Sequence, residues 1–512
     1  MPSNSSNTKR IAKNTIVLYL RMFLMLAINL FTSRVILKTL GVSDYGIYSA
    51  VGGIVSMFTL VSGALTNSVT RFLTFELGKG DPERISRVFS ISINVMLILC
   101  LIILIVGDPI GIWFLNNKMD IPVGRMIAAN WVLQCAILTF LINLISIPFN
   151  ATIIAHERMS VFAYISIIDA ILKLLIVYAL YISPIDRLIV YAVLLLLVAC
   201  TVRIIYSVYC HRHFPECKYR RVHDKELFKN MTSFAGWNFF GYGAKVVNDQ
   251  GINLLMNVFF GVTVNAARGV AVQVKSAVTH FVTNFTMALN PQITKSYAAG
   301  NLLYMHSLIF RGAKFSYFLM LFFVIPLCLE TELVLKLWLS VVPPHAVAFV
   351  RLTLIAATIN VINDTIIKGL HATGKIKKYM IIVGIVELLN FPFTYIAFRF
   401  GASPEVAYYI FISVYGFLAF LRVFLVKDLI SLRFLDYFKE VFFKCLLVTI
   451  PSLIFPIYLS LQMEDSILRL AIVVIASLIT TALSAYCLGL TCSERETIKK
   501  YIRKIVIISN KK

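Results

Sequence analysis

Long apolar stretches separated by short polar loops run through almost the whole chain of 512 residues. A helix needs about 20 apolar residues to cross the hydrocarbon core of a bilayer. We predict such helices at 14–35, 47–70, 88–107, 126–149, 161–182, 188–209, 232–259, 264–289, 312–329, 347–367, 379–398, 406–426, 441–461 and 467–489. Little sequence remains for a soluble domain, so the pattern predicts an all-α integral membrane protein with about fourteen transmembrane helices.

Basic residues occur in every second loop, and this alternation predicts the topology. The basic stretches are Lys9–Lys13, Arg71–Arg87, Arg212–Lys229, Lys295–Lys314, Lys368–Lys378, Lys427–Lys439 and Arg495–Lys512. Loops rich in Lys and Arg stay in the cytoplasm, so both termini are expected there. The net charge of +23 would suggest nucleic acid on a soluble protein. Here the loops account for it, and the expected contacts are membrane lipids, with no nucleic acid.

The two halves of the sequence share a weak repeat at one constant offset. Its matches are Ile28–Leu30 with Ile252–Leu254, Ala64–Leu65 with Ala288–Leu289, and Thr70–Arg71 with Thr294–Lys295. An offset of six spans preserves orientation, so the halves would be related by an axis along the membrane normal. We therefore predict a first lobe of helices 1–6 over 1–210, a basic cytoplasmic linker over 211–230, and a second lobe of helices 7–12 over 231–428. Two extra helices and a basic tail occupy 429–512.

Five cations are concentrated in three of the predicted spans. Arg21 and Arg34 are in the first span, and Lys245, Arg268 and Lys275 are in the seventh and eighth. A charge at bilayer mid-depth costs roughly 2.5–3.5 kcal/mol, so these side chains should face a wet or protein-lined interior. A cation-lined interior predicts an anionic substrate, and arginine and lysine both suit a diphosphate. For Arg34 the alternative is a position near the outer interface, with the charge reaching water.

Polar side chains accompany these cations. Asn29 and Asn253 lie along the same spans and are candidates for contacts with sugar hydroxyls, although asparagine in a span also bridges helices. Lys245 and Asp249 are four residues apart and share a helix face, which predicts either an internal ion pair or a site that exchanges the pair for phosphate or an ion.

Two further acids, Asp364 and Glu387, have no cation at helical spacing inside their predicted spans, although Lys368 follows just beyond the end of the span that contains Asp364. Together with Asp249 they are the candidates for coupling to H⁺ or Na⁺, and the alternative is a partner on a neighbouring helix. The stretch Cys210–Cys217 matches no zinc pattern, so no metal is expected. Since no Walker lysine loop, nucleophile elbow or paired-histidine helix is present, we expect no cofactor and no enzymatic activity.

Short motifs near the start of each half resemble those of a known transporter group. They are the opening stretch Asn14–Arg34, the segment Leu40–Tyr48 with its "LG…YG.Y" element, and Ala288–Pro291 followed by Thr294–Lys295. With about fourteen spans in this arrangement, the chain resembles the polysaccharide transporter branch of the multidrug/oligosaccharidyl-lipid/polysaccharide (MOP) flippase superfamily, and within it the Wzx-type O-antigen or capsule-repeat flippases.

This resemblance implies an alternating-access flippase of the bacterial cytoplasmic (inner) membrane. Its substrate would be an undecaprenyl-diphosphate-linked oligosaccharide, moved from the cytoplasmic to the outer leaflet for surface polysaccharide synthesis. A polysaccharide polymerase and a chain-length regulator are its candidate protein partners. By span position, the resemblance makes Arg21, Lys245, Arg268 and Lys275 candidates for holding the diphosphate.

Three other functions remain as alternatives. A multidrug/cation antiporter of the same superfamily needs acids in its cavity, whereas cations dominate spans 1, 7 and 8 here. A lipid II flippase would differ only in the sugar. A membrane glycan polymerase or glycosyltransferase needs a large polar outer loop, and the longest predicted outer loop, Gly107–Arg125, is short and apolar.

Overall fold

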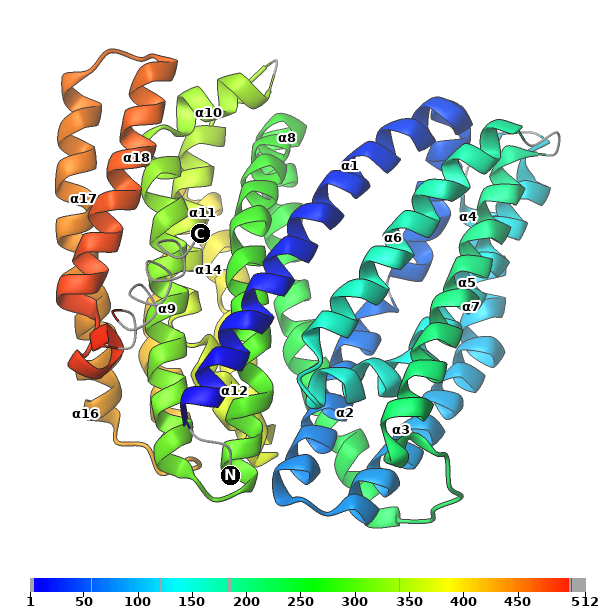
Figure 1. Cartoon of the computed structure of the whole chain (residues 1–512). Helices are drawn as coiled ribbons and strands as arrows, with labels where there is room; N and C mark the ends of the chain where they lie inside the picture. Colours follow the sequence, from blue (N-terminus) through cyan, green and yellow to red (C-terminus); the bar gives the residue numbers. More distant parts are fainter. Residues whose placement is uncertain are drawn as a thin grey trace, which may run out of the picture. The chain divides into compact units, whose positions relative to one another are not determined.

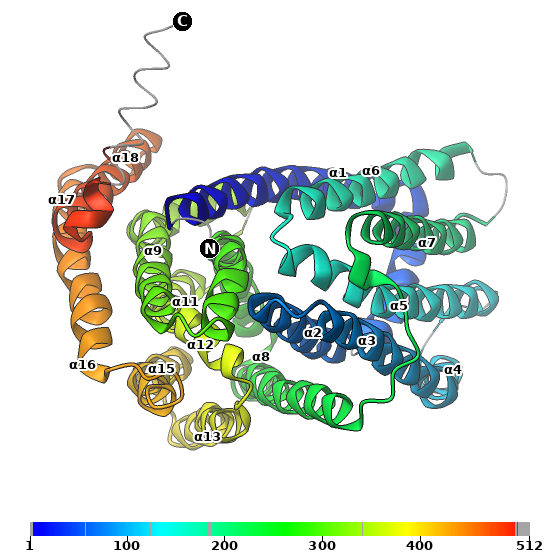
Figure 2. The same ribbon diagram turned by 60° about the horizontal axis from the view of Figure 1, so that its bottom comes forward.

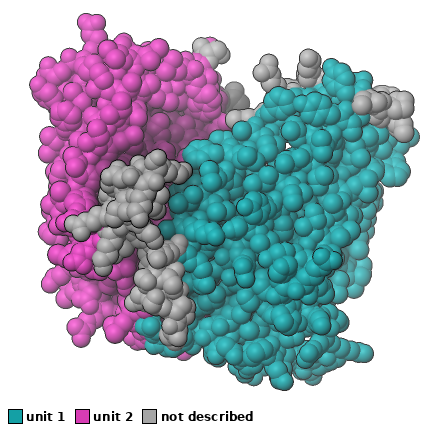
Figure 3. All heavy atoms as spheres, in the orientation of Figure 1, with its two compact units in different colours: residues 1–243, 287–301 teal, residues 244–286, 302–512 magenta. Residues whose placement is uncertain are grey.

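The computed structural model describes residues 4–499, apart from 57, 120, 123, 183–185, 340 and 497–498, and this part of the chain contains helices and no strand (Figure 1). By their internal contacts, residues 1–243 and 287–301 form one compact unit, which we call unit 1. Residues 244–286 and 302–512 form unit 2 (Figure 3). The all-α fold class is therefore confirmed. The predicted lobes 1–210 and 231–428 stay a prediction, because the units group residues by contact and not by repeat.

Unit 1 consists of helices, and three of those that begin in it start at an aspartate cap, one of which is Asp224, whose side chain accepts from the backbone of Leu227. Asp81 accepts hydrogen bonds from the backbone of Glu83 and Arg84, and Asp186 does the same for Leu188 and Ile189. The elements are α1 (Asn4–Ser56), α2 (Thr59–Lys79), α3 (Pro82–Ile102), η1 (Ile103–Gly107), α4 (Asp108–Lys118), α5 (Met126–Ala155), α6 (Met159–Ile182), α7 (Arg187–His213), η2 (Pro215–Cys217) and both ends of α8 (Lys225–Ala298).

The long helices α1 and α8 are each two helices joined at one glycine. Gly41 has φ 78° and ψ 169°, and Gly261 has φ 80° and ψ −177°. Side chains other than glycine rarely adopt this backbone conformation, so each glycine permits a reversal without a longer loop. The breaks follow the predicted first and seventh spans. Lys245 and Asp249 therefore lie on the first half of α8, and Arg268 and Lys275 lie on the second half.

Unit 2 contains the middle of α8 and the rest of the chain. Its other elements are α9 (Leu302–Leu329), α10 (Thr331–Trp338), α11 (Ala346–Val361), α12 (Asp364–Thr373), α13 (Lys377–Leu388), α14 (Asn390–Arg399), α15 (Val406–Val426), α16 (Phe434–Tyr437), η3 (Phe438–Phe443), α17 (Lys444–Gln462), α18 (Ile467–Ser484) and η4 (Ala485–Gly489). Figures 1 and 2 show α17 and α18 side by side, and both pack against α9.

Buried ion pairs hold α18 and the segment after η4 to α9 and the residue that follows it. The Lys314 ammonium on α9 lies 3.0 Å from the Glu494 carboxylate, which follows η4. Arg469 on α18 lies 2.8 Å from Glu330, whose side chain is fully buried at the end of α9. Each charge removed from water therefore has an opposite charge beside it, as burial in a membrane protein requires.

Ten helices in the described part of the chain are long and apolar enough to cross a membrane. The number becomes eleven if α11 and α12, which bend by 41° at their junction, form one span. The predicted spans 232–259 and 264–289 are helical within α8, while the predicted span 47–70 is divided between α1, which ends at Ser56, and α2, which begins at Thr59. The total of fourteen stays a prediction. The prediction of a loop over Gly107–Arg125 was wrong, because the π-helical turn η1 continues α3 into α4 as far as Lys118.

Candidate functional site

A cavity of about 600 Å³ lies inside unit 2, between the two halves of α8 and the helices α11, α12 and α15. Its charged lining residues are Lys245, Asp249, Arg268, Lys275 and Asp364. The helical period explains how α8 contributes so many of them. Lys245, Asp249 and Asn253 are spaced by four residues on one half, while Arg268 and Lys275 are seven apart on the other. Each set therefore shares one helix face.

Most of the residues predicted from the sequence meet in this cavity. They are Lys245, Asp249, Asn253, Arg268, Lys275 and Asp364. Arg21 belongs to unit 1 and is not among the lining residues, while Asn29 and Arg34 lie within α1 but their side chains are outside the described part of the structure. The structure thus brings residues from predicted spans 7, 8 and 10 together, and their roles stay predictions.

The cavity cations are not neutralised by ion pairs. Within the described part of the chain, no carboxylate oxygen lies within 4.0 Å of the charged nitrogens of Lys245, Arg268 or Lys275. The possible internal pair of Lys245 with Asp249 is therefore not formed. Arg268 donates a hydrogen bond of 2.9 Å to the backbone carbonyl of Asp249 and also interacts with the Tyr408 hydroxyl, and a guanidinium has five N–H donors in all. Since these cationic groups only donate hydrogen bonds, their remaining donors need an anion or water.

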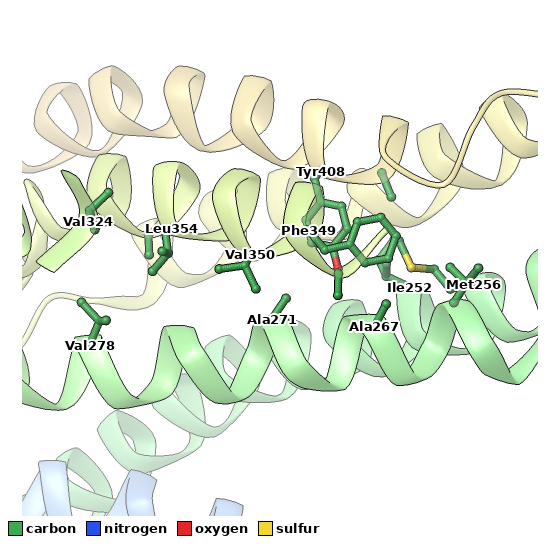
Figure 4. Close-up of a cluster of buried hydrophobic side chains, with 14 of the residues drawn as sticks. Ile252, Met256, Ala267, Ala271, Val278, Val324, Phe349, Val350, Leu354 and Tyr408 are labelled. Carbon is green, nitrogen blue, oxygen red and sulfur yellow. The ribbon is translucent and has the colours of Figure 1, made fainter. Parts of the chain in front are cut away.

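One side of the cavity is an apolar wall that fixes α8 against α11 and α15. Figure 4 shows Ile252, Met256, Ala267 and Ala271 of α8 beside Phe349, Val350 and Leu354 of α11, and all of these side chains are buried. The Phe349 and Tyr408 rings are 4.7 Å apart between centroids. Tight packing of this kind stabilises helix pairs in lipid, where the hydrophobic effect between helices is absent. It holds the charged face of α8 in a defined position.

Arg21 has a different environment. Its guanidinium lies 4.5 Å from the centroid of the Phe162 ring on α6, and its buried Nε has no hydrogen-bond partner among the described atoms. A cation over an aromatic face is stabilised by the ring quadrupole, by about 0.5–2 kcal/mol. This geometry favours a packing contact between α1 and α6.

The alternative left open for Glu387, a partner on a neighbouring helix, is the one that the structure contains. Arg422 of α15 lies 2.8 Å from the Glu387 carboxylate on α13, and it also donates to Asn360 at 2.5 Å. Neither Arg422 nor Asn360 was among the predicted site residues, although Arg422 is a cation inside the predicted span 406–426. A count of every charge within the spans would have found it.

A family model described as "Polysaccharide biosynthesis protein" matches residues 11–297 of the chain. Among curated proteins, the uncharacterized membrane protein EpsK of Bacillus subtilis (strain 168) is 21% identical over 148 residues. That alignment spans only 28% of this chain and 29% of EpsK.

Solved structures of transporters share the fold. A single-residue mutant of a MATE transporter superimposes with a TM-score of 0.72 at 14% identity, covering 83% of this chain and 96% of that one. An outward-facing multidrug resistance MATE transporter of the MOP superfamily gives 0.70 at 14% identity with the same coverage. A MOP superfamily transporter from Pyrococcus furiosus, reported to have a binding pocket of reverse polarity, gives 0.70 at 13% identity, again over 83% and 96%. At this identity the likeness concerns the fold alone.

Proposed function

Because the chain belongs to the polysaccharide biosynthesis protein family, a family of multi-pass membrane transporters in the MOP superfamily, we propose that it is an alternating-access flippase for lipid-linked oligosaccharides. Its substrate would be an undecaprenyl-diphosphate-linked repeat unit, moved from the cytoplasmic to the outer leaflet of the bacterial inner membrane for surface polysaccharide synthesis. The observation that supports this most is the set of three cations, Lys245, Arg268 and Lys275, that line one cavity without an ion-pair partner among the described residues.

A diphosphate fits the chemistry of this cavity. The arginine offers two parallel N–H donors, each lysine offers a compact charge, and hydrogen bonds of these groups to phosphate oxygens contribute roughly 1.5–3 kcal/mol each. Three cations against the acids Asp249 and Asp364 leave an excess of positive charge. The volume of about 600 Å³ lies in the range of small-molecule sites and suits a head group. The polyprenyl tail would remain in the bilayer.

The membrane potential would drive the proposed direction of transport. Moving two negative charges outward across a negative-inside membrane is favoured by about 4–5 kcal/mol per 100 mV. We propose that H⁺ or Na⁺ binding at Asp249 or Asp364 returns the carrier. Cytoplasmic termini, and work beside a polysaccharide polymerase and a chain-length regulator, belong to the same proposal.

The test is transport of a fluorescent undecaprenyl-diphosphate oligosaccharide in proteoliposomes with an imposed potential, read as the fraction that a membrane-impermeant quencher reaches. Arg268→Ala should abolish the transport signal while membrane insertion stays normal. The matched control is Lys375→Ala, which removes an exposed cation between α12 and α13 and should transport at the wild-type rate. Wild-type transport by Arg268→Ala would remove Arg268 from the site, and a rate that ignores the potential would contradict the electrogenic step.

The similarity to MATE structures keeps a cation antiporter as the second candidate. Such a pump would bind a lipophilic cation in a cavity where acids prevail, the opposite of the balance found here. Binding of tetraphenylphosphonium by the purified protein, without binding of a prenyl diphosphate, would favour the antiporter and contradict the flippase proposal.

A further inference from the structure

Asn360 and Asp364 stand at the bend between α11 and α12 and both line the cavity. They are four residues apart across this bend, and both side chains reach the same cavity. Asn360 has not been assigned a role above, and Asp364 entered only as a candidate for ion coupling. Because both residues line the same cavity, they could contact the same group of a bound ligand.

The orientation of the Asn360 amide is fixed from behind. The Arg422 guanidinium donates to Asn360 Oδ1 at 2.5 Å and to Glu387 Oε1 at 2.8 Å, and Arg422 is 4% exposed. Arginine nitrogens only donate, so the amide oxygen must point at Arg422 and the NH₂ group must point away from it. Among the described residues, no acceptor is bonded to Asn360 Nδ2. Asn360 therefore presents a donor to the cavity.

Asp364 presents the complementary acceptor. Its carboxylate makes no hydrogen bond or ion pair with a described side chain. Asp364 lines the cavity, and its oxygens are not among the buried polar atoms that lack a hydrogen-bond partner. The Tyr415 ring lies at the same cavity surface, and the Arg422 guanidinium is 5.6 Å from its centroid. One buried arginine thus contacts both an amide and an aromatic ring that border the cavity.

A donor, an acceptor and an aromatic face side by side form the combination that binds a sugar. A hydroxyl group accepts through its oxygen and donates through its hydrogen, so it can take a bond from Asn360 Nδ2 and give one to Asp364. A phosphate could use only the first of these and would be repelled by the carboxylate. We propose that Asn360, Asp364 and Tyr415 form a subsite for sugar hydroxyls, in which Arg422 and Glu387 are positioning residues. This proposal rests on the proposed function, since it adds the sugar to the diphosphate.

The buried Arg422–Glu387 pair supports this assignment. Removing two charges from water inside a membrane protein is costly, and such a pair often stabilises the fold no better than apolar residues of similar size. A positioning role gives the pair a function. It keeps the Asn360 amide in the orientation that offers its NH₂ group to the cavity.

The experiment compares two soluble probes of equal charge on the purified full-length protein in nanodiscs. One is farnesyl diphosphate esterified with N-acetylglucosamine, and the other is the methyl ester of farnesyl diphosphate. The ratio of their dissociation constants measures the contribution of the sugar, because effects on the diphosphate affect both probes. We expect the wild type to prefer the sugar-bearing probe by about tenfold, as one good pair of hydrogen bonds would give.

Asn360→Asp keeps the shape of the side chain and the contact with Arg422 but removes the NH₂ donor. The variant should therefore bind the two probes about equally. Asp364→Asn keeps an acceptor oxygen but loses the negative charge that strengthens the bond, so it should lower the preference by a smaller factor, and it serves if the first variant does not fold. Arg422→Lys, which keeps a charge beside Glu387 but loses the two-armed contact, should give an intermediate preference.

The outcomes separate this inference from the proposed function. If the wild type binds neither probe, the proposed function is wrong. If it binds both equally, or if Asn360→Asp and Asp364→Asn keep the wild-type preference, the diphosphate site stands and the sugar subsite is wrong. The subsite is also wrong if Asp364→Asn removes a dependence of binding on H⁺ or Na⁺ while the preference is unchanged.

Discussion

The cavity of unit 2 and a cluster around Glu157 in unit 1 contain similar charges in opposite arrangements. In the cavity, Lys245, Arg268 and Lys275 have no carboxylate partner within the described residues. In unit 1, the Glu157 side chain is 1% exposed and lies 2.6 Å from Arg10 and 2.7 Å from Lys295.

In the Glu157 cluster, both carboxylate oxygens and the backbone carbonyl of Glu157 accept hydrogen bonds or face a cation. Gln292 donates to the second carboxylate oxygen at 2.6 Å, and Asn14 donates to the backbone carbonyl of Glu157 at 3.2 Å. Donors thus come from the start of α1 and the end of α8, and they meet at the turn between α5 and α6. The Glu157 carboxylate accepts from two cations and one amide, so its charge is neutralised within unit 1 and its orientation is fixed. Saturated charges join segments, whereas the unpaired cations of the cavity are available to a substrate.

The largest expected effect is loss of the saturated acid. Glu157→Ala would leave Lys295 and Gln292 without their buried partner, and breaking a buried pair from one side costs about 3–5 kcal/mol. Thermal unfolding of the detergent-solubilised protein should show a marked drop in midpoint. The control is Glu83→Ala, because Glu83 forms an exposed pair with Arg87, and such pairs contribute about 0–1 kcal/mol. Equal stability of the two variants would contradict the contrast between the regions.

The cavity should respond in the reverse way. Lys275→Met removes a cation that has no carboxylate partner among the described residues, so stability should be unchanged or slightly higher. Affinity for farnesyl diphosphate should fall by about 10- to 100-fold, from the loss of roughly 1.5–3 kcal/mol of charge-assisted hydrogen bonding. The matched variant is Lys295→Met at the Glu157 cluster, which should lose stability and keep the affinity. If both variants lose affinity equally, the two regions do not differ in function.

These same residues show which features of the fold and the site can be predicted from the sequence. The apolar lengths predicted helices, and the cost of charges in lipid picked out Lys245, Arg268 and Lys275, because both signals are local in the chain. The sequence pattern did not predict ion pairs between residues that lie on distant segments. Arg422 and Glu387 lie on α15 and α13, so helical spacing could not join them. Glu157 stands in a turn with φ 60°, and its partners come from the far ends of unit 1 in sequence.

A smaller effect is expected where α2 approaches the end of α8 beside the Glu157 cluster. A Cβ added at Gly78 would lie 2.9 Å from the Lys295 Cα and 2.8 Å from the Ala298 Cβ, so the backbones must separate. Overpacking of this kind costs about 1–3 kcal/mol, and Gly78→Ala should lower the unfolding midpoint accordingly. Gly236→Ala is the control, because no atom lies within 4 Å of its added Cβ. A Gly78→Ala variant as stable as Gly236→Ala would mean that the two helices are not held together there.

The smallest effect concerns Glu216, an acid with one side-chain partner, which is intermediate between the fully paired Glu157 cluster and the unpaired cavity cations. In the linker between α7 and α8, Glu216 is bonded to His156 at 2.5 Å. Burial by itself raises the pKa of Glu216. The hydrogen bond and charge of His156, together with a hydrogen bond from a backbone N–H, lower the pKa by more than burial raises it, so the net pKa is below its usual value of 4.5. An acid with a lowered folded-state pKa stabilises the fold fully above pH 4.5, and this contribution is lost as pH falls through the folded-state pKa. Between pH 6 and pH 3.5 the wild type should therefore lose stability more steeply than Glu216→Gln. The exposed Glu226→Gln should follow the wild type, and identical slopes for wild type and Glu216→Gln would show that His156 does not hold the carboxylate in solution.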